Sequence, residues 1–522
     1  MTTLNKDWLG AKRHGGVLRA ASMSLELPQP PKRFFHHGWQ SWSLATWAAP
    51  AALPIQKPAL LHPLQVDPEF AGHRRAHSSW VGAVEMDDAR ILLLGALGLD
   101  AHVELEGNRL RGWYTAGAGR WFMALGTEQD VFARYARALR RAYGPASRKK
   151  VPRVWSSWYS LYAGIDEGVL HHIFEELGDL PFDVLQVDDG WERSVGDWQP
   201  GDGFPSGMKH MAQKIKATGR KAGLWLAPLV AVGSSRLFRE HPDWFLHDDE
   251  GSLVSAGFNW GEPLFGLDTT HEAARAWLRQ LMEQVRAWGF DYLKLDFLYA
   301  GALPGKRAKE MPREAAYRSG LELLRSAMGT DAYFVACGAP ILPSLGMCDA
   351  LRVGPDVAGF WENHRDAVWL RNLTTPGARN SIRTVLHRMW LKPLVQLDPD
   401  VAYFRSVECA LTSEQKSLVK ALCLICGFKS SSDLPQWLTA VERRELETFL
   451  RSASRVEQTG RYRYRIAGQE VDFSESVELP AAPNGLDSLA SAFMGWLSNQ
   501  GWALRAFDAL SKNNLKRLRN KI

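Results

Sequence analysis

The hydrophobic pattern divides the chain into two parts of different character. Before about residue 125, short apolar segments alternate with turns, and the alternation in HVELEGNRLRGWY predicts a hairpin around Gly107 and Asn108. Residues 129–143 have helical periodicity, and the following GPASRKK, residues 144–150, is typical of a linker. We therefore predict an all-β N-terminal domain with a linker helix, covering residues 1–148.

From residue 151, short apolar strands alternate with amphipathic helices. One predicted helix ends at Gly219, and another begins with a capping box of Thr269 and Glu272 and ends at Gly289. No G-x-G-x-x-G motif follows the first strand, which disfavours a doubly wound sheet. Eight strands separated by helices predict a (β/α)8 TIM barrel over residues 149–440. The predicted strands are 151–158, 182–191, 221–229, 290–297, 332–340, 350–356, 393–398 and 427–433.

Residues 441–522 are predicted to form a small C-terminal β-rich region with a helical tail. Its last 40 residues have the pattern of one or two amphipathic helices. A solvated helical tail is the simpler interpretation, and contact with an anionic membrane or a partner is the alternative. The end of this tail is basic, with Asp508 opposed by Arg505, Lys512, Lys516, Arg517, Arg519 and Lys521.

Composition and charge narrow the class of protein. Hydrophobic residues make up 46% of the chain and charged residues 23%, which is typical of a soluble globular protein. The excess of six positive charges is too dilute to predict a nucleic-acid partner. No signal-peptide pattern and no apolar run of about 18 residues is present, so we predict a soluble, cytoplasmic protein. An oligomer is compatible with these data, but its size does not follow from them.

The five cysteines do not form the pattern of a disulfide framework or a zinc site. Their number is odd, and Cys423 and Cys426 lie in an apolar segment where buried packing is the simpler interpretation. No H-E-x-x-H motif is present. We predict neither a metal nor another cofactor.

The segment DYLKLDFLYAGALPG places Lys294 and Asp296 within an apolar strand. Their side chains face the same side, because alternate residues of a strand do so. An isolated buried charge is costly, so the two groups need each other, water or a ligand. A buried ion pair is the simpler interpretation. In a barrel, however, catalytic side chains project from the carboxyl ends of the strands. Those ends carry Trp158, Asp188, Asp189, Trp225, Lys294, Asp296, Cys337, Arg352 and Asp356.

Two carboxylates at one site are the minimum requirement for cleaving a glycosidic bond. Lys294 favours the ionised form of Asp296, as a nucleophile requires. Asp356 follows a Gly-Pro turn and precedes an apolar stretch, a setting that raises the pKa of a general acid. We expect Arg352 to point toward sugar hydroxyls or the nucleophile rather than toward Asp356. The 22 tryptophans also suit sugars, which present both apolar faces and hydroxyls.

Four motifs, DDGW, YLKLDFLYAGALPG, ACGAPILP and LRVGPD, resemble in order and spacing those of the bacterial α-galactosidases of glycoside hydrolase family 36. The resemblance runs from about Trp39 to about Phe473. It implies an N-terminal β-sandwich, a (β/α)8 barrel and a short C-terminal β-rich part. It also implies retaining, exo-acting hydrolysis of terminal α-D-galactosides in oligosaccharides or glycoconjugates, with Asp296 as nucleophile and Asp356 as acid/base.

The same resemblance implies a set of substrate contacts. The implied contacts are Asp188 and Asp189 with O4 and O6 of galactose, Lys294 with the O3 and O4 region, and Cys337, Gly338 and Arg352 with the O2 side. Trp158 and Trp225 would line the pocket, and either Trp39 or Trp42 of GWQSW would close it.

Other functions remain open at the level of sequence. The segment WLKPLVQLDPD, residues 390–400, departs from the family pattern WLNDPD by extra residues and by Leu397 in place of asparagine. Galactosyl transfer of the raffinose- or stachyose-synthase kind would use the same covalent intermediate. Activity as an α-N-acetylgalactosaminidase needs room at O2. A non-catalytic glycan-binding protein on this scaffold is the alternative from another class.

Overall fold

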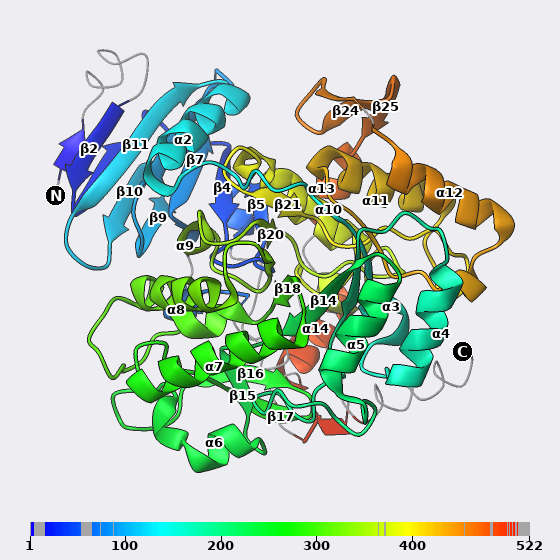
Figure 1. Ribbon diagram of the computed structural model, residues 1–522. Coiled ribbons are helices and arrows are strands. Elements are labelled where there is room, and N and C mark those ends of the chain that lie inside the picture. Colours follow the sequence, from blue (N-terminus) through cyan, green and yellow to red (C-terminus); the bar gives the residue numbers. More distant parts are fainter. Residues whose placement is uncertain are drawn as a thin grey trace.

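The computed structural model (Figure 1) has two N-terminal sheets, a large parallel sheet and several smaller elements. Among the described residues, none of the helices combines the length and apolar character needed to cross a bilayer. The described residues are 2–4, 16–53, 65–71, 73, 75–86, 88–363, 365–369, 372–453, 455–480, 484–497, 500, 502–503, 505–506 and 509.

The N-terminal part contains two mostly antiparallel sheets whose apolar faces pack together. Gly112 faces Trp121 so closely that a Cβ there would lie 2.8 Å from the indole ring, which explains the absence of a side chain. The first sheet has the order β1 (Thr2–Leu4), β3 (Ser22–Glu26), β10 (Arg109–Tyr114), β9 (Ala101–Glu106), β6 (Ala76–Ser79). The second has the order β2 (Gly16–Ala20), β11 (Gly119–Gly126), β8 (Ile91–Ala96), β7 (Val81–Glu85), β4 (Arg33–His37), β5 (Ala45–Ala48).

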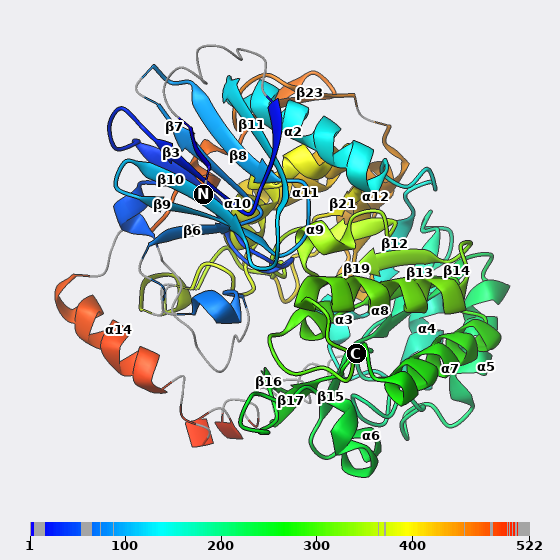
Figure 2. The same ribbon diagram turned by 90° about the vertical axis from the view of Figure 1, so that its left-hand side faces the viewer.

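The predicted hairpin and linker helix are confirmed. Strands β9 and β10 pair antiparallel across Gly107 and Asn108, with Gly107 at φ 59°. Helix α2 spans Glu128–Tyr143 and packs on β8 and β11 through Val131, Tyr135 and other buried side chains. Figure 2 shows these sheets and α2 above the helices of the large parallel sheet.

The central element is a curled sheet of eight parallel strands. Its strands neighbour each other in chain order, and the last strand pairs with the first. All eight predicted strands are confirmed, in shorter form. They are β12 (Arg153–Ser156), β13 (Val184–Val187), β14 (Lys221–Leu226), β18 (Tyr292–Leu295), β19 (Tyr333–Ala336), β20 (Ala350–Arg352), β21 (Gln396–Asp398) and β22 (Lys429–Ser431).

Helices separate these strands and cover the sheet. The helices are α3 (Trp158–Leu161), α4 (Glu167–Leu177), α5 (Gly207–Ala217), α6 (Arg236–Glu240), α7 (Glu272–Trp288), α8 (Arg313–Met328), α9 (Ile341–Ser344), α10 (Ala378–His387), α11 (Ser413–Cys426) and α12 (Ala440–Arg451). A small antiparallel sheet of β15 (Val230–Val232), β17 (Glu262–Gly266) and β16 (Ser255–Asn259) is inserted after β14. Short helical turns are η1 (Pro50–Ala52), η2 (Pro68–Phe70), η3 (Pro242–Trp244), η4 (Leu298–Ala302), η5 (Arg365–Trp369), η6 (Met389–Leu391) and η7 (Pro435–Trp437).

One predicted helix start is wrong. Helix α7 ends at Gly289 in the left-handed conformation, as predicted, but its N-cap is His271 rather than Thr269. The Thr269 hydroxyl is buried and donates to the carbonyl of Ala316 in α8, so it is not available to cap α7. The expected capping box is therefore replaced by a bond from the backbone N–H of Ala274 to the His271 ring.

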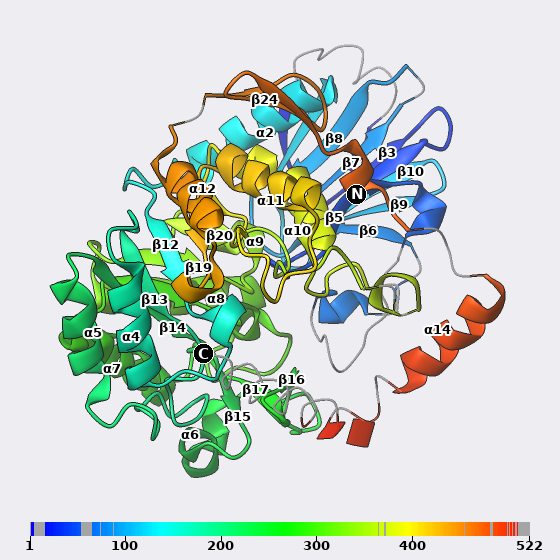
Figure 3. The same cartoon turned by 90° about the vertical axis from the view of Figure 1, so that its right-hand side faces the viewer.

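The described residues of the C-terminal part include a three-stranded sheet and the helices α13 and α14. Its elements are β23 (Val456–Gln458), β24 (Arg463–Ile466), β25 (Gln469–Asp472), α13 (Ser474–Val477) and α14 (Gly485–Leu497). Figure 3 shows α14 at the edge of the molecule. Helix α14 agrees with the predicted helical tail, whereas Lys512, Lys516, Arg517, Arg519 and Lys521 lie outside the described residues.

The predicted buried packing of Cys423 and Cys426 is confirmed. All five lie in described residues and are free, and Cys423 and Cys426 are buried on α11. Within the described ranges, no group of three His, Cys, Asp or Glu side chains could hold a metal ion.

Candidate active site

Lys294 and two aspartates meet at the carboxyl ends of β13 and β18, which lie on either side of β14. The Nζ atom of Lys294 lies 3.1 Å from Oδ2 of Asp188 and 3.9 Å from Oδ2 of Asp296. Burial alone would lower the pKa of Lys294, but these two carboxylates raise it above its ordinary value. Lys294 is therefore a buried cation held between two anions that follow β13 and β18.

Asp188 and Asp189 follow β13 and are held differently. Asp188 accepts hydrogen bonds from Ser156 and Gln186, in addition to its contacts with Lys294. Oδ2 of Asp189 accepts from the indole Nε1 of Trp260 at 2.9 Å. Burial, assisted by the charge of Asp188, raises the pKa of Asp189 to about 6.

Glu192 was not expected at this place. It shares a hydrogen bond with Asp189, and burial and the charge of Asp189 raise the pKa of Glu192 well above its ordinary value. A raised pKa favours the protonated form of Glu192, whose carboxyl group can donate a hydrogen bond to the neighbouring carboxylate. The DDGW motif is thus part of a larger group of carboxyls than its two aspartates.

The carboxyl group of Asp296 is firmly oriented. Its Oδ2 accepts from Nε1 of Trp225 at 3.0 Å, and its Oδ1 accepts from the backbone N–H of Phe297 at 2.9 Å. Phe297 has φ 52°, so the chain turns away immediately after the strand. Charge-assisted hydrogen bonds of this kind suit an ionised carboxylate.

Arg352 binds carboxylates, which contradicts the expectation that it turns away from Asp356. Its Nη1 lies 3.1 Å from Oδ1 of Asp356 and 2.9 Å from Oδ2 of Asp400. Its Nε lies 3.1 Å from Oδ2 of Asp398, the residue paired with Arg352 across β20 and β21. The two buried aspartates at the end of β21 require a cation, and Arg352 is the one in register with them.

The environment of Asp356 nevertheless raises its pKa. Burial is the largest cause, Arg352 and Lys294 act in the opposite direction, and the charge of Asp296 contributes to the rise. The side chain keeps 31% of its surface exposed, so a ligand can reach it. The expected direction of the shift therefore holds although Arg352 is in contact.

Asp400 is a further carboxyl that the sequence analysis did not single out. It accepts from the hydroxyl of Tyr159 and from the backbone N–H of Val357. Burial and the nearby Asp356 and Asp398 raise the pKa of Asp400 to about 7, against the effect of Arg352. Asp398 and Asp400 stand at the carboxyl end of the predicted strand 393–398. Their position is therefore the same signal that identified the candidate residues at the other strand ends. No comparable signal marks Trp260, which comes from the inserted β16–β17 turn.

Gly338 and Trp42 meet beside Asp296. Gly338 has φ 52°, and a Cβ there would lie 3.1 Å from Cα of Phe297 and 3.1 Å from Cη2 of Trp42. The ring of Trp42 meets that of Phe297 edge to face at 5.1 Å. Cys337 is buried, and burial raises the pKa of its thiol well above the ordinary value. The GWQSW segment thus reaches the parallel sheet through Trp42.

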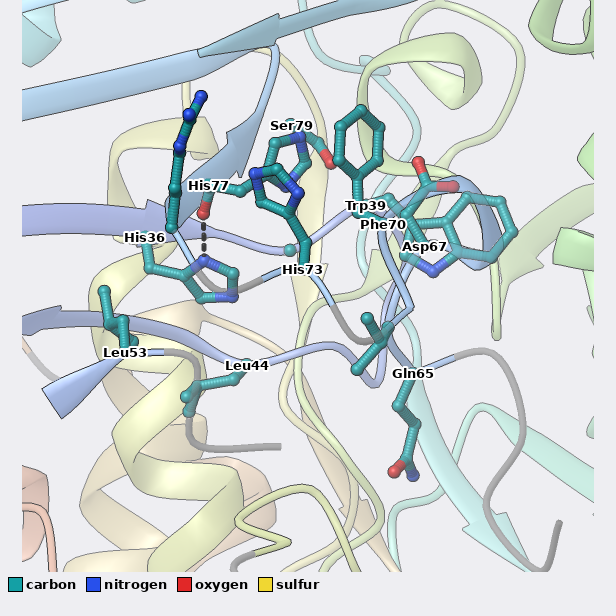
Figure 4. A pocket seen from close by; sticks show the side chains of 13 residues that line it. His36, Trp39, Leu44, Leu53, Gln65, Asp67, Phe70, His73, His77 and Ser79 are labelled. Atoms are coloured by element: carbon teal, nitrogen blue, oxygen red, sulfur yellow. Dashed lines mark hydrogen bonds between the residues drawn. The ribbon is translucent and has the colours of Figure 1, made fainter. Parts of the chain in front are cut away.

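Trp39 points elsewhere. It is buried under the guanidinium of Arg313, whose Cζ lies 5.4 Å from the ring centroid. Trp39 also lines a cavity beside the N-terminal strands, together with His36 and His77 (Figure 4). In that cavity Nδ1 of His36 donates to the carbonyl of His77 at 2.5 Å. Of the two candidate tryptophans, Trp42 is therefore the one in contact with Phe297 beside Asp296.

The tryptophans at the strand ends differ in their surroundings. Trp225 is buried and bonded to Asp296. Trp158 is only partly buried, and its ring packs edge to face against Tyr162 at 5.2 Å. The role of Trp158 in a pocket stays a prediction.

Comparisons with known proteins agree on one family. The Melibiase family model matches residues 127–328. The structure of the α-galactosidase TtGalA from Thermus thermophilus, in complex with p-nitrophenyl α-D-galactopyranoside, is 46% identical. It has a TM-score of 0.82, and the match covers 88% of this chain and 94% of that one.

Other matching proteins are less similar in sequence or match over a smaller part of the chain. The α-galactosidase AgaA from Geobacillus stearothermophilus is 15% identical with a TM-score of 0.56, covering 84% of this chain and 63% of that one, a likeness of fold. Alpha-galactosidase 2 from Pediococcus pentosaceus is 30% identical over 159 residues, 29% of this chain and 21% of its own. The match thus spans about a fifth of the length of that curated relative.

Proposed function

Since the chain belongs to the α-galactosidases of glycoside hydrolase family 36, we propose that it hydrolyses terminal, non-reducing α-D-galactosides with retention of configuration. The observation that carries this proposal is the contrast between the carboxyl of Asp296, which follows β18, and that of Asp356, which follows β20, two strands away. Asp296 is oriented by two N–H donors beside a buried lysine. Asp356 has a raised pKa and remains accessible. Such a contrast suits a nucleophile and a general acid.

In the first step, the carboxylate of Asp296 attacks the anomeric carbon and the bond to the leaving oxygen breaks. Asp356 gives its proton to that oxygen, so the aglycone leaves as a neutral alcohol and Asp356 becomes a carboxylate. In the second step, Asp356 takes a proton from water, whose oxygen attacks the anomeric carbon and releases Asp296. Two inversions give net retention.

We propose that Asp188, Asp189 and Lys294 bind the galactose hydroxyls around O3, O4 and O6. Each of these groups is buried, so an epimer that lacks one contact leaves a charge without its partner. Cys337 and Gly338 are proposed for the O2 side, and Trp42 and Trp225 for the pocket wall. Arg352 is occupied by Asp356, Asp398 and Asp400, so we assign it to positioning the acid/base.

The proposed architecture follows the family. We interpret the curled parallel sheet as a (β/α)8 barrel of residues 149–440. The two N-terminal sheets form a β-sandwich within residues 1–148, and residues 441–522 form a small C-terminal region. TtGalA has also been solved in complex with stachyose, which supports galactosyl oligosaccharides as substrates.

The test is release of nitrophenol from aryl α-galactoside, α-glucoside and N-acetyl-α-galactosaminide. We expect activity on the galactoside and a loss of about a thousandfold or more in Asp296→Ala and in Asp356→Ala. Azide distinguishes the two roles. It should yield β-galactosyl azide with Asp296→Ala, by single inversion, and α-galactosyl azide with Asp356→Ala, through the covalent intermediate.

Asp331→Ala is the matched control, because Asp331 is an exposed aspartate at the amino end of β19, opposite the site. Its activity should equal that of the wild type. A folded protein inactive on all three substrates would contradict the proposal and favour a glycan-binding role. Galactosyl transfer products at high acceptor concentration, in excess of hydrolysis, would favour a transferase.

A further inference from the structure

Asp400 is a buried carboxyl beside the proposed acid/base. It follows Asp398 and Pro399 at the carboxyl end of β21, and its side chain is 1% exposed, against 31% for Asp356. Its backbone has φ 85°, in the left-handed region that residues other than glycine seldom adopt. Backbone strain of this kind persists where the surrounding contacts hold it, and it is typical of functional sites. Because Asp400 is closed to solvent, any function of its carboxyl acts through the groups that it contacts.

Oδ2 of Asp400 joins three parts of the candidate site. It accepts from the hydroxyl of Tyr159 and from the backbone N–H of Val357 at 3.0 Å, and it lies 2.9 Å from Nη1 of Arg352. Val357 follows Asp356 directly, and the same Nη1 atom donates to Oδ1 of Asp356 at 3.1 Å. The carboxyls of Asp356 and Asp400 therefore share one guanidinium nitrogen.

The charges around Arg352 are unequal. Its single positive charge meets the three carboxyls of Asp356, Asp398 and Asp400. Two negative charges on one nitrogen repel each other, so the pair of Asp356 and Asp400 gives up its second proton only at a higher pH than either carboxyl would alone. In agreement with this, burial and the charges of Asp356 and Asp398 raise the pKa of Asp400 to about 7, against the effect of Arg352.

Other ionisable groups interact with the pair from the surrounding elements. Asp356 interacts with Asp188 after β13, with Lys294 and Asp296 at the end of β18, and with Tyr162 and Cys337. Asp400 interacts with Tyr403 and with Cys423 on α11, and Tyr159 interacts with both carboxyls. Burial raises the pKa of each of these phenols and thiols, so they carry no charge near neutral pH. The carboxyls, Arg352 and Lys294 therefore determine the charge balance of the pair.

Building on the proposed glycosidase function, we propose that Asp400 is a positioning residue that shares Arg352 with Asp356 and so keeps a proton on the acid/base near neutral pH. The charge of Asp400 offsets part of the attraction of Arg352, which by itself would favour the ionised form of Asp356. The bond from the N–H of Val357 also fixes the backbone next to Asp356. Asp400 performs both tasks without contact with the substrate.

The test is the pH dependence of kcat/KM for phenyl α-galactoside in the wild type and in Asp400→Asn. Asparagine keeps the shape of the side chain and an acceptor oxygen in place of Oδ2. Its amide nitrogen replaces Oδ1, which is buried without a hydrogen-bond partner among the described residues. The alkaline limb of the profile reports loss of the acid's proton from the free enzyme. Without the charge of Asp400, Arg352 acts on Asp356 with less opposition, so we expect this limb to move to lower pH by about one unit or more.

Tyr159→Phe is a second variant that keeps Asp400. It removes a hydroxyl whose hydrogen bond favours the ionised form of Asp400. Asp400 then carries less negative charge at a given pH, so the alkaline limb should move in the same direction as in Asp400→Asn, but by less. A limb that moves to higher pH in Tyr159→Phe would contradict the proposal.

α-Galactosyl fluoride separates this role from general damage to the site. Its leaving group needs little protonation, so the first step depends only weakly on the general acid. At about pH 8 we expect Asp400→Asn to lose about tenfold in kcat/KM on phenyl α-galactoside and less than about twofold on the fluoride. Equal losses on the two substrates, or a pH profile that coincides with that of the wild type, would overturn the proposal.

Asp349→Asn is the matched control. Asp349 is a buried aspartate directly before β20, at the opposite end of that strand from Arg352, and it pairs with Arg325 and Lys149. Its substitution should lower stability and leave the pH profile of kcat/KM unchanged. The same shift of the alkaline limb in Asp349→Asn as in Asp400→Asn would show that the shift is not specific to the pair, against the proposal.

A double-mutant cycle of Asp356→Asn and Asp400→Asn in denaturant unfolding requires no enzymatic activity. Because the two carboxyls share one cation, the changes in the unfolding midpoint should be non-additive above about pH 7. Additive changes would overturn the proposal. If the folded wild type hydrolysed neither galactoside, the proposed function would fail, and this cycle would still decide whether Asp356 and Asp400 are coupled.

Discussion

Gly338 connects a backbone conformation to the geometry of the candidate site. At φ 52° it occupies the left-handed region, where a side chain costs about 1 kcal/mol or more. A Cβ at this position would also approach the backbone of Phe297 and the ring of Trp42, each at 3.1 Å. Phe297 follows Asp296 directly, so displacement of its backbone moves the N–H that orients the carboxylate.

Gly338→Ala should therefore lose both stability and activity. We expect a loss of about 1–2 kcal/mol in the free energy of unfolding and a decrease in kcat/KM of about tenfold or more. Gly427→Ala is the matched control, since Gly427 has φ 81° and no heavy atom lies within 4 Å of the position that a Cβ would occupy there. Gly427→Ala should lose stability alone; equal kcat/KM in the two variants would show that crowding at Gly338 does not matter.

At the scale of the element, the sequence pattern of a capping box forms a real cap at some helix starts and not at others. Thr412 with Gln415, and Thr439 with Glu442, form complete capping boxes at the starts of α11 and α12. The pattern at Thr269 does not, because the hydroxyl of Thr269 bonds to a neighbouring helix instead. Local spacing identifies candidates, and packing decides which of them cap.

Thr412→Ala should lower the free energy of unfolding by about 1 kcal/mol, because the N–H of Gln415 loses its acceptor. Thr412→Ser keeps the hydroxyl and should retain most of this stability. Denaturant unfolding of both variants measures the difference, and their kcat/KM should match the wild type. A loss in Thr412→Ser as large as that in Thr412→Ala would point to packing of the methyl group instead.

At the scale of the whole molecule, Arg388 joins the GWQSW segment to the parallel sheet. Its Nη1 donates to the carbonyls of Ser41 and Val353, at 2.5 and 3.2 Å. Its Nη2 donates to the carbonyls of Gly38, Gln40 and Ser43, and burial lowers the pKa of Arg388 to about 9. This one buried side chain holds the loop that carries Trp42.

Arg388→Met should destabilise the protein by at least about 2 kcal/mol, because it leaves buried carbonyls without a donor. It should also raise KM for the aryl galactoside, since Trp42 loses its support. Arg220→Met is the control: Arg220 donates to the carbonyls of Gly178 and Leu180 near the surface. Thermal unfolding and steady-state kinetics of both variants test this, and an unchanged KM in Arg388→Met would contradict the role of the loop.

Glu314 is a second contact between the N-terminal sheets and the parallel sheet. It lies on α8 and accepts from Nε1 of Trp80 and from the backbone N–H of Asp100. Burial, with the charge of Asp100, raises the pKa of Glu314 to about 8. Between its ordinary pKa and this value, the folded protein holds a proton that the unfolded chain releases.

The free energy of unfolding should therefore fall as the pH rises from the ordinary pKa of a glutamate to about 8. Glu314 should contribute up to about 1.4 kcal/mol per pH unit to this fall. Glu314→Gln carries no titratable proton and can still accept both hydrogen bonds. Unfolding free energies measured from about pH 5 to about pH 8 should decline less steeply in the variant. If the free energy of unfolding depends on pH in the same way in the wild type and in Glu314→Gln, then Glu314 is ionised in the folded protein.

The sequence by itself determined the elements whose signals are local. Eight apolar strand segments separated by helices predicted the parallel sheet, because a buried strand needs a continuous run of apolar side chains. The spacing of Lys294 and Asp296 predicted that their side chains share one side of the strand, and the two charged groups lie 3.9 Å apart.

Only the tertiary structure decided features that depend on partners far apart in the chain. It placed Arg352 among Asp356, Asp398 and Asp400, and it brought Trp42 rather than Trp39 against Phe297. Each of these results from a hydrogen bond, an ion pair or a packing contact between segments whose separation in the sequence carries no periodic signal.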